Sequence, residues 1–211
     1  MAEVVIAVDG PAGSGKSSVS KAAARELGFG YLDTGAGYRA FAIHRSHFPD
    51  LELGLLVESF DYSISTDPDN EQVTLSSKDV TQEIRTETVS SAVSGVAREQ
   101  LVRNLQLEDA RKRIADCPNP GIIVEGRDIT SVVAPDAILK VLLTASPSVR
   151  LERRGLEGTE PAGNILKRDL SDGQIVDFIT PGEGVRLLDT TEMDFQGSIA
   201  ALVKMIKEVN K

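Results

Sequence analysis

A glycine-rich segment near the beginning of the chain constrains the fold more than any other feature. Its sequence, Gly10-Pro-Ala-Gly-Ser-Gly-Lys-Ser-Ser18, satisfies the pattern G-x-x-x-x-G-K-[ST]. The apolar run Val4–Val8 before it is typical of a strand that is buried on both faces in a parallel sheet. The stretch after it ends at Gly28 and has apolar residues at helical spacing, which predicts a helix with a glycine C-cap. These apolar residues are Val19, Ala22, Ala23 and Leu27.

Such a segment between a strand and a helix is typical of a phosphate-binding loop. The glycines allow successive backbone N–H groups to turn toward phosphate oxygens, and the helix N-terminus adds partial positive charge. We expect Lys16 to reach the β- and γ-phosphates of ATP and the Ser17 hydroxyl to coordinate Mg²⁺. The predicted nucleotide-binding residues are Gly10, Pro11, Ala12, Gly13, Ser14, Gly15, Lys16, Ser17 and Ser18.

Further short apolar segments alternate with helical patterns along the chain, at residues 29–33, 122–125, 138–143 and 185–189. Alternation of strands and helices indicates parallel β-α-β units, because each parallel strand needs a crossover connection. We therefore predict an α/β fold with a doubly wound, parallel, five-stranded sheet.

Residues 59–85 break this alternation. They contain short alternating pieces at 62–65 and 73–75, separated by the turn-rich sequence Asp67-Pro-Asp-Asn70. This pattern predicts a small β insert at 59–85 in a core formed by residues 1–58 and 86–211.

Polar clusters follow two of the predicted strands. Arg39 comes soon after the segment 29–33, and Arg127 and Asp128 come directly after the segment 122–125. Because ligands collect at the carboxyl ends of strands in a doubly wound sheet, we expect both arginines to face the phosphate-binding loop. A guanidinium can bind two phosphate oxygens at once, so this pair favours a phosphate site over a solvated surface.

Composition excludes several other classes of protein. The net charge is −9, from 23 basic and 32 acidic residues, which argues against a nucleic-acid-binding protein. The apolar runs are shorter than the roughly 20 residues that span a bilayer. The single cysteine, Cys117, rules out an internal disulfide framework and a cysteine-based structural zinc site. We expect a cytoplasmic monomer that binds neither nucleic acid nor membranes.

Several segments, in this order, resemble motifs of the bacterial cytidylate kinases over nearly the whole chain. They are the phosphate-binding loop at 10–17, Leu32-Asp-Thr-Gly-Ala-Gly-Tyr-Arg39, Asp79-Val-Thr-Gln-Glu-Ile-Arg-Thr86, Glu125-Gly-Arg-Asp128, Val132-Val-Ala-Pro-Asp136 and Leu188-Asp-Thr-Thr191. The resemblance implies a phosphate-loop kinase that uses ATP to phosphorylate CMP and dCMP. It also implies that the insert at 59–85 binds the nucleoside monophosphate and that a short lid at about 150–175 closes over ATP.

The resemblance also implies roles for individual residues. The acceptor phosphate would be held by Thr34, Arg39 and Arg127, and the cytosine by Ser94, Arg103 and Asp128. The sugar would be approached by Arg168 and Asp172, and the lid would begin with Arg150, Arg153 and Arg154. The residues expected to act in catalysis are Lys16, Arg39, Arg127, Arg153 and Arg168.

Two departures from the family pattern keep alternatives open. The family continues as R-D-x-x-D-x-x-R, whereas this chain has Ile175, or Gln174 if the gap falls earlier, where the last arginine is expected. The segment 155–167 is also shorter than the family's lid. One alternative is a phosphate-loop kinase for another nucleoside monophosphate, and the other is a nucleotide-binding module without turnover.

Overall fold

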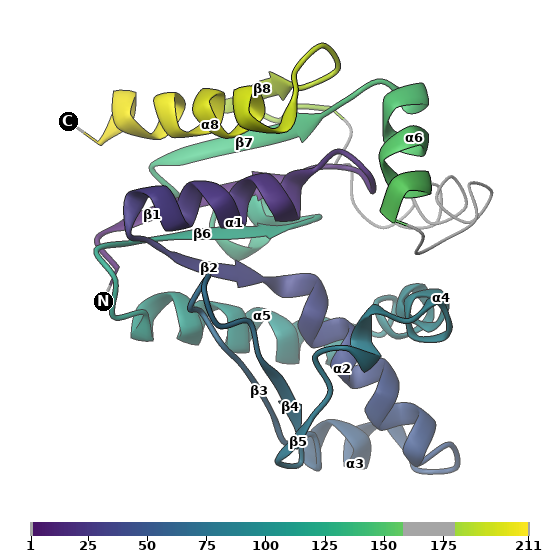
Figure 1. Ribbon diagram of the computed structural model, residues 1–211. Helices are drawn as coiled ribbons and strands as arrows, with labels where there is room; N and C mark the ends of the chain where they lie inside the picture. Colours follow the sequence, from purple (N-terminus) through teal and green to yellow (C-terminus); the bar gives the residue numbers. More distant parts are fainter. Residues whose placement is uncertain (1, 158–179, 211) are drawn as a thin grey trace.

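The computed structural model of the protein describes residues 2–157 and 180–210, without the side chains of 154–157 (Figure 1). Its centre is a five-stranded sheet in the order β2-β6-β1-β7-β8, in which all neighbouring strands are parallel. The strands are β1 (Val4–Asp9), β2 (Gly30–Asp33), β6 (Gly121–Gly126), β7 (Leu139–Thr144) and β8 (Val185–Asp189). The predicted α/β fold with a parallel five-stranded sheet is confirmed.

Helices cover both faces of this sheet, so that alternate residues of a strand belong to different cores. Ile6 and Val8 pack on one face with the apolar sides of the helices α1 (Lys16–Leu27) and α8 (Phe195–Val209). Ala7 faces the other side, where it packs with residues of the helices α2 (Thr34–His47) and α5 (Gln100–Asp116). Figure 1 shows α1 and α8 side by side. A central strand buried on both faces explains why β1 is apolar without alternation.

The segment predicted as a β insert forms a second, antiparallel sheet in the order β3-β4-β5. Its strands are β3 (Tyr62–Ile64), β4 (Val73–Leu75) and β5 (Lys78–Asp79), followed by the short 3₁₀ helix η1 (Glu83–Arg85). Ile64, Val73 and Ile84 belong to the same hydrophobic core as Ala7 of the large sheet. The small sheet is therefore packed against the main body, and the proposed division at 59–85 stays a prediction.

The remaining elements connect these layers. They are α3 (Leu53–Glu58), α4 (Glu87–Val96), the π-helical turn η2 (Ile129–Val133) and α6 (Pro147–Glu157). The end of α1 follows the predicted pattern, because Gly28 adopts the left-handed conformation with φ 67° and donates its N–H to the last turn. No helix within residues 2–157 and 180–210 combines the length and the apolar character needed to cross a membrane.

Candidate functional site

The register of the large sheet places three polar segments at one edge. Asp9 at the end of β1 pairs with Gly126 of β6, and Asp33 at the end of β2 pairs with Glu125 of the same strand. Contacts between the segments follow from this register. Arg127 Nη1 donates to the carbonyl oxygen of Gly10 at 3.0 Å, which joins the segment after β6 to the phosphate-binding loop.

The phosphate-binding loop has the backbone that its glycines permit. Gly13 and Gly15 have φ values of 74° and 88°, in the left-handed region that favours glycine. A side chain at Gly10 would overlap the backbone oxygen of Leu143, so the loop can lie this close to β7 only with glycine there. Gly15 is the N-cap of α1 and has no side chain to accept from the first-turn N–H groups. These donors suit an anionic ligand.

Arginines of α6 hold the loop from the side of β8. Arg150 Nη1 donates to the carbonyl oxygen of Ala12 at 3.0 Å, and Arg153 Nη1 donates to that of Ser14 at 3.1 Å. Arg153 also donates to the hydroxyl and carbonyl oxygens of Thr190, at 3.0 and 2.9 Å. The described contacts of Arg153 therefore support the backbone of the loop.

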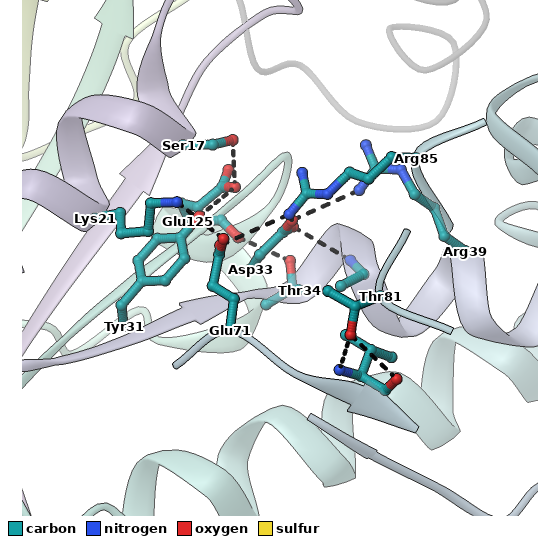
Figure 2. A network of polar contacts seen from close by, with 12 residues as sticks. Ser17, Lys21, Tyr31, Asp33, Thr34, Arg39, Glu71, Thr81, Arg85 and Glu125 are labelled. Atoms are coloured by element: carbon teal, nitrogen blue, oxygen red, sulfur yellow. Dashed lines mark hydrogen bonds and ion pairs between the residues drawn. The ribbon is translucent and has the colours of Figure 1, made fainter. Parts of the chain in front are cut away.

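A buried carboxylate lies beneath the loop, in a position that sequence reasoning left without a role. Glu125 is 1% exposed, and its Oε1 accepts from the Ser17 hydroxyl at 2.6 Å and from the Tyr31 hydroxyl at 3.3 Å (Figure 2). Lys16 Nζ lies 3.5 Å from its Oε2. Burial raises the pKa of Glu125, and the ammonium of Lys16 opposes this rise. Burial likewise lowers the pKa of Lys16, against the attraction of Glu125.

The surroundings of Ser17 fit Mg²⁺. Glu125 Oε2 is buried and has no hydrogen-bond partner among the described residues, although Lys16 lies nearby. A phosphate-loop hydroxyl next to a carboxylate is the pair that holds Mg²⁺ in phosphate-loop proteins. Within the described part of the chain, no group of three or more His, Cys, Asp or Glu side chains could hold a metal ion. Mg²⁺ bound here would therefore take most of its ligands from phosphate oxygens and water, as is usual for this ion.

A second carboxylate, Asp33, organises the arginines on the acceptor side. Its Oδ2 lies 3.7 Å from both Arg39 Nη1 and Arg85 Nη2, and its Oδ1 accepts from the Ala36 N–H at 3.2 Å at the N-cap of α2 (Figure 2). Burial alone would raise the pKa of Asp33, but Arg39, Arg85 and Lys16 together lower it below its ordinary value. Arg85, on η1, is a further cation of this site that the sequence did not predict, although it lies in the family-like segment 79–86.

A small cavity of about 60 Å³ is lined by several of the residues predicted to bind the base. Thr34, Arg103 and Asp128 line it, and Arg103 Nη2 donates to Asp128 Oδ2 at 2.8 Å. Burial raises the pKa of Asp128 despite the neighbouring guanidinium. Burial, with the Asp128 charge second, raises the pKa of Tyr38, another lining residue, to about 12. Ser94 lies on α4 and is not one of the lining residues.

Some predicted positions lie outside the described residues. Arg168, Asp172 and Ile175 belong to this part of the chain, as does the side chain of Arg154. Of the predicted acceptor-side residues, Arg127 contacts the loop, Arg39 lies next to Asp33, and Thr34 and Asp128 line the cavity. Thr34 Oγ1 donates to the carbonyl oxygen of Glu125 at 2.9 Å, which ties the beginning of α2 to β6.

Comparisons with known proteins show the family to which the chain belongs. The family model described as "Cytidylate kinase" matches residues 6–208. A cytidylate kinase of Cutibacterium acnes is 38% identical over 220 residues, which cover 96% of this chain and 96% of the relative. A cytidylate kinase of Rhodococcus opacus is 39% identical over 225 residues, which cover 97% of this chain and 95% of the relative.

Solved structures with low sequence identity support the fold alone. An uncharacterized protein from Eubacterium ventriosum matches with a TM-score of 0.54 at 13% identity, covering 97% of this chain and 99% of its own. The protein TT1252 from Thermus thermophilus matches with a TM-score of 0.50 at 17% identity, covering 97% and 98%. On the family model and the full-length relatives, the chain belongs to the cytidylate kinase family.

Proposed function

We propose that the protein transfers the γ-phosphoryl group of ATP to CMP or dCMP, giving ADP and CDP or dCDP. Family membership supports the reaction, and one contact supports the site. Arg127, expected at the acceptor phosphate, donates to Gly10 of the phosphate-binding loop at 3.0 Å. This contact supports donor and acceptor groups that lie next to each other, as transfer between two bound nucleotides requires.

On the donor side, the backbone N–H groups of the loop and the Lys16 ammonium would bind the β- and γ-phosphates of ATP. Ser17 and Glu125 would hold Mg²⁺, which when bound neutralises charge on the phosphates. Glu125 also places its own carboxylate 3.5 Å from the buried Lys16 Nζ, which favours the protonated form of that amine.

On the acceptor side, the nucleophile is a phosphate oxygen that is already anionic. No strong general base is needed, so the protein's task is alignment and stabilisation of charge in the transition state. Arg39 and Arg127 would each bind the acceptor phosphate through two N–H donors of the planar guanidinium group. Asp33 lies 3.7 Å from Arg39 and from Arg85, and it orients both guanidinium groups near the loop.

The base would be read in the cavity lined by Thr34, Arg103 and Asp128. Cytosine presents an amino group that donates, and ring N3 and O2 atoms that accept. A guanidinium and a carboxylate held 2.8 Å apart offer the complementary donor and acceptor. We keep Ser94 for the base, Arg168 and Asp172 for the sugar, and the insert at 59–85 and the lid at about 150–175 as parts of this proposal.

The proposal is tested by ADP formation from MgATP with CMP, dCMP, UMP, AMP or no acceptor. We expect rapid turnover with CMP and dCMP and little without an acceptor. Lys16→Ala is the control: it should abolish ADP formation if the reaction takes place at the phosphate-binding loop. ATP binding without turnover for any acceptor would contradict a kinase, and turnover confined to AMP or UMP would contradict the cytosine assignment.

A further inference from the structure

Gln106, on α5, is a buried amide with one hydrogen-bonding end that has no partner. The residue is 6% exposed and lines the same cavity as Arg103 and Asp128. Its Nε2 is buried and makes no hydrogen bond among the described residues, whereas its Oε1 lies 3.3 Å from the Tyr62 hydroxyl. A buried amide group without a partner destabilises the unliganded protein, so a ligand that supplies a partner gains affinity.

The backbone of α2 fixes the place of this amide. A side chain at Gly37 would overlap Gln106 Oε1, so the amide can lie against α2 only because residue 37 is glycine. Tyr62, from β3, contacts the same end of the amide. The side chain is therefore held between α2 and the small sheet, and its other end is the one without a partner among the described residues.

Tyr62 determines which atom of the Gln106 amide lies next to its hydroxyl. Its hydroxyl has one hydrogen and two acceptors within reach, Gln106 Oε1 and Asp109 Oδ2. The Asp109 carboxylate lies closer to the hydroxyl than the amide does and is the stronger acceptor, so it takes the hydrogen. The same carboxylate oxygen also accepts from Arg113 Nε at 2.7 Å. Burial, and then the Asp109 charge, raise the pKa of Tyr62 well above its ordinary value, so the phenol keeps that hydrogen.

The Tyr62 oxygen then offers only lone pairs to Gln106. An amide oxygen in this place would form no hydrogen bond with the phenol oxygen, whereas an amide NH₂ in the same place would donate to it. Rotation of the amide by 180° exchanges its two atoms without moving the side chain. In this orientation Gln106 donates to Tyr62, and its carbonyl oxygen becomes the end without a partner.

We propose that Gln106, oriented by Tyr62, is a further specificity-determining residue whose carbonyl accepts a hydrogen from the 4-amino group of cytosine. The inference rests on the proposed function. The amino group carries two hydrogens, so Asp128 and Gln106 can each accept one. Uracil has a carbonyl oxygen at the same ring position, which would face two acceptors, and an amide held by Tyr62 cannot turn its NH₂ to meet it.

The test compares kcat/KM for CMP, UMP and the 4-deamino analogue of CMP, which has a hydrogen in place of the amino group. Gln106→Leu removes the amide at similar volume, and we expect the CMP-to-UMP ratio to fall about tenfold, as for one lost hydrogen bond. With the analogue, Gln106→Leu should match the wild type. Gln196→Leu, at an exposed glutamine on α8, is the matched control and should leave all three values unchanged.

Tyr62→Phe tests the orienting role separately. It removes the hydroxyl but keeps the ring that stacks on Phe60, with centroids 4.5 Å apart. The amide is then free to turn toward either base, so the CMP-to-UMP ratio should fall, mainly through a gain with UMP. Should Gln106→Leu fail to fold, as thermal unfolding would show, this variant decides the question.

The outcomes separate this inference from the proposed function. An unchanged CMP-to-UMP ratio in the folded variants, with both substrates affected alike, overturns the role of Gln106 and leaves the kinase activity standing. An equal loss with CMP and with the analogue overturns it too, since the amide would not be reading the amino group. Failure of the wild type to phosphorylate any acceptor refutes the proposed function, and the inference with it.

Discussion

Asp9→Asn tests how the phosphate-binding loop is joined to the acceptor side. Asp9 ends β1, directly before Gly10, and is 4% exposed. Its Oδ1 accepts from the Ile129 N–H at 2.8 Å, and its Oδ2 accepts from the N–H and hydroxyl of Thr130, at 2.9 and 2.6 Å. These bonds hold the beginning of η2, and so the segment that carries Arg127 and Asp128.

The structure gives the size of the effect. Asparagine keeps one acceptor for Ile129, but it places an NH₂ against the N–H of Thr130, while the Thr130 hydroxyl can turn and accept. One partly buried N–H thus loses its partner, which costs about 1–3 kcal/mol. In a chain of this size each kcal/mol lowers the Tm by about 2–4 °C, so the Tm should fall by about 2–12 °C. We also expect kcat/KM for CMP to fall about tenfold or more, because small displacements of positioning groups are costly.

Thermal unfolding and initial rates of ADP formation check this prediction. Asp67→Asn is the control, because Asp67 is exposed and accepts from the Asp69 N–H at 2.9 Å in a turn that asparagine forms equally well. It should change the free energy of unfolding by no more than about 0.5 kcal/mol. An Asp9→Asn protein with unchanged Tm and unchanged kcat/KM for CMP would refute the reasoning.

Three further changes probe the two halves of the site. Lys16→Ala should lower kcat by about 10²–10³-fold or more with an unchanged far-UV circular dichroism spectrum, and normal turnover would remove Lys16 from the mechanism. Arg39→Ala should raise the KM for CMP and lower kcat with little change in ATP binding by titration, whereas a loss of ATP affinity alone would assign Arg39 to the donor side. Burial lowers the pKa of Lys16 and Glu125 opposes this, so kcat/KM for ATP should decline with rising pH below the ordinary lysine range. In Glu125→Gln the decline should begin at lower pH still, and an unmoved pH profile would show that Glu125 does not support the ammonium.

The parts of the fold that rest on local signals could be predicted from the sequence. The buried run of β1, the glycines of the loop and the end of α1 at Gly28 each follow from a few neighbouring residues. The central strands β6 and β7 are recognisable because most of their residues are apolar, as is usual for central parallel strands.

Helix α5 could not be predicted in this way. Its buried residues are Val102, Gln106 and Ala110, so its inner face holds a polar and a small side chain where an apolar stripe is expected. Gln106 is buried because Gly37 leaves room for it and Tyr62 contacts it, and both residues are distant in sequence. Only the packing of the whole domain makes this helix recognisable.

The same limit applies to Glu125 and Arg85 in the site. Both lie in segments that resemble family motifs, yet their partners depend on the register between β2 and β6 and on the position of η1. The surroundings of His44 depend on the whole fold in the same way, although His47 lies only three positions after it on α2. His44 is buried in contact with the rings of Phe41 and Phe60, and its Nε2 lies 3.2 Å from the Ser59 hydroxyl, so its role is in packing.

The fate of the γ-phosphoryl group tests the central claim most directly. ATP labelled in its γ-phosphate is incubated with the protein, Mg²⁺ and CMP, and the products are separated. If the loop and the acceptor arginines form one crevice, the label appears in CDP, with little inorganic phosphate formed. Label found only in inorganic phosphate, or remaining in ATP, would contradict a site built for transfer between two nucleotides.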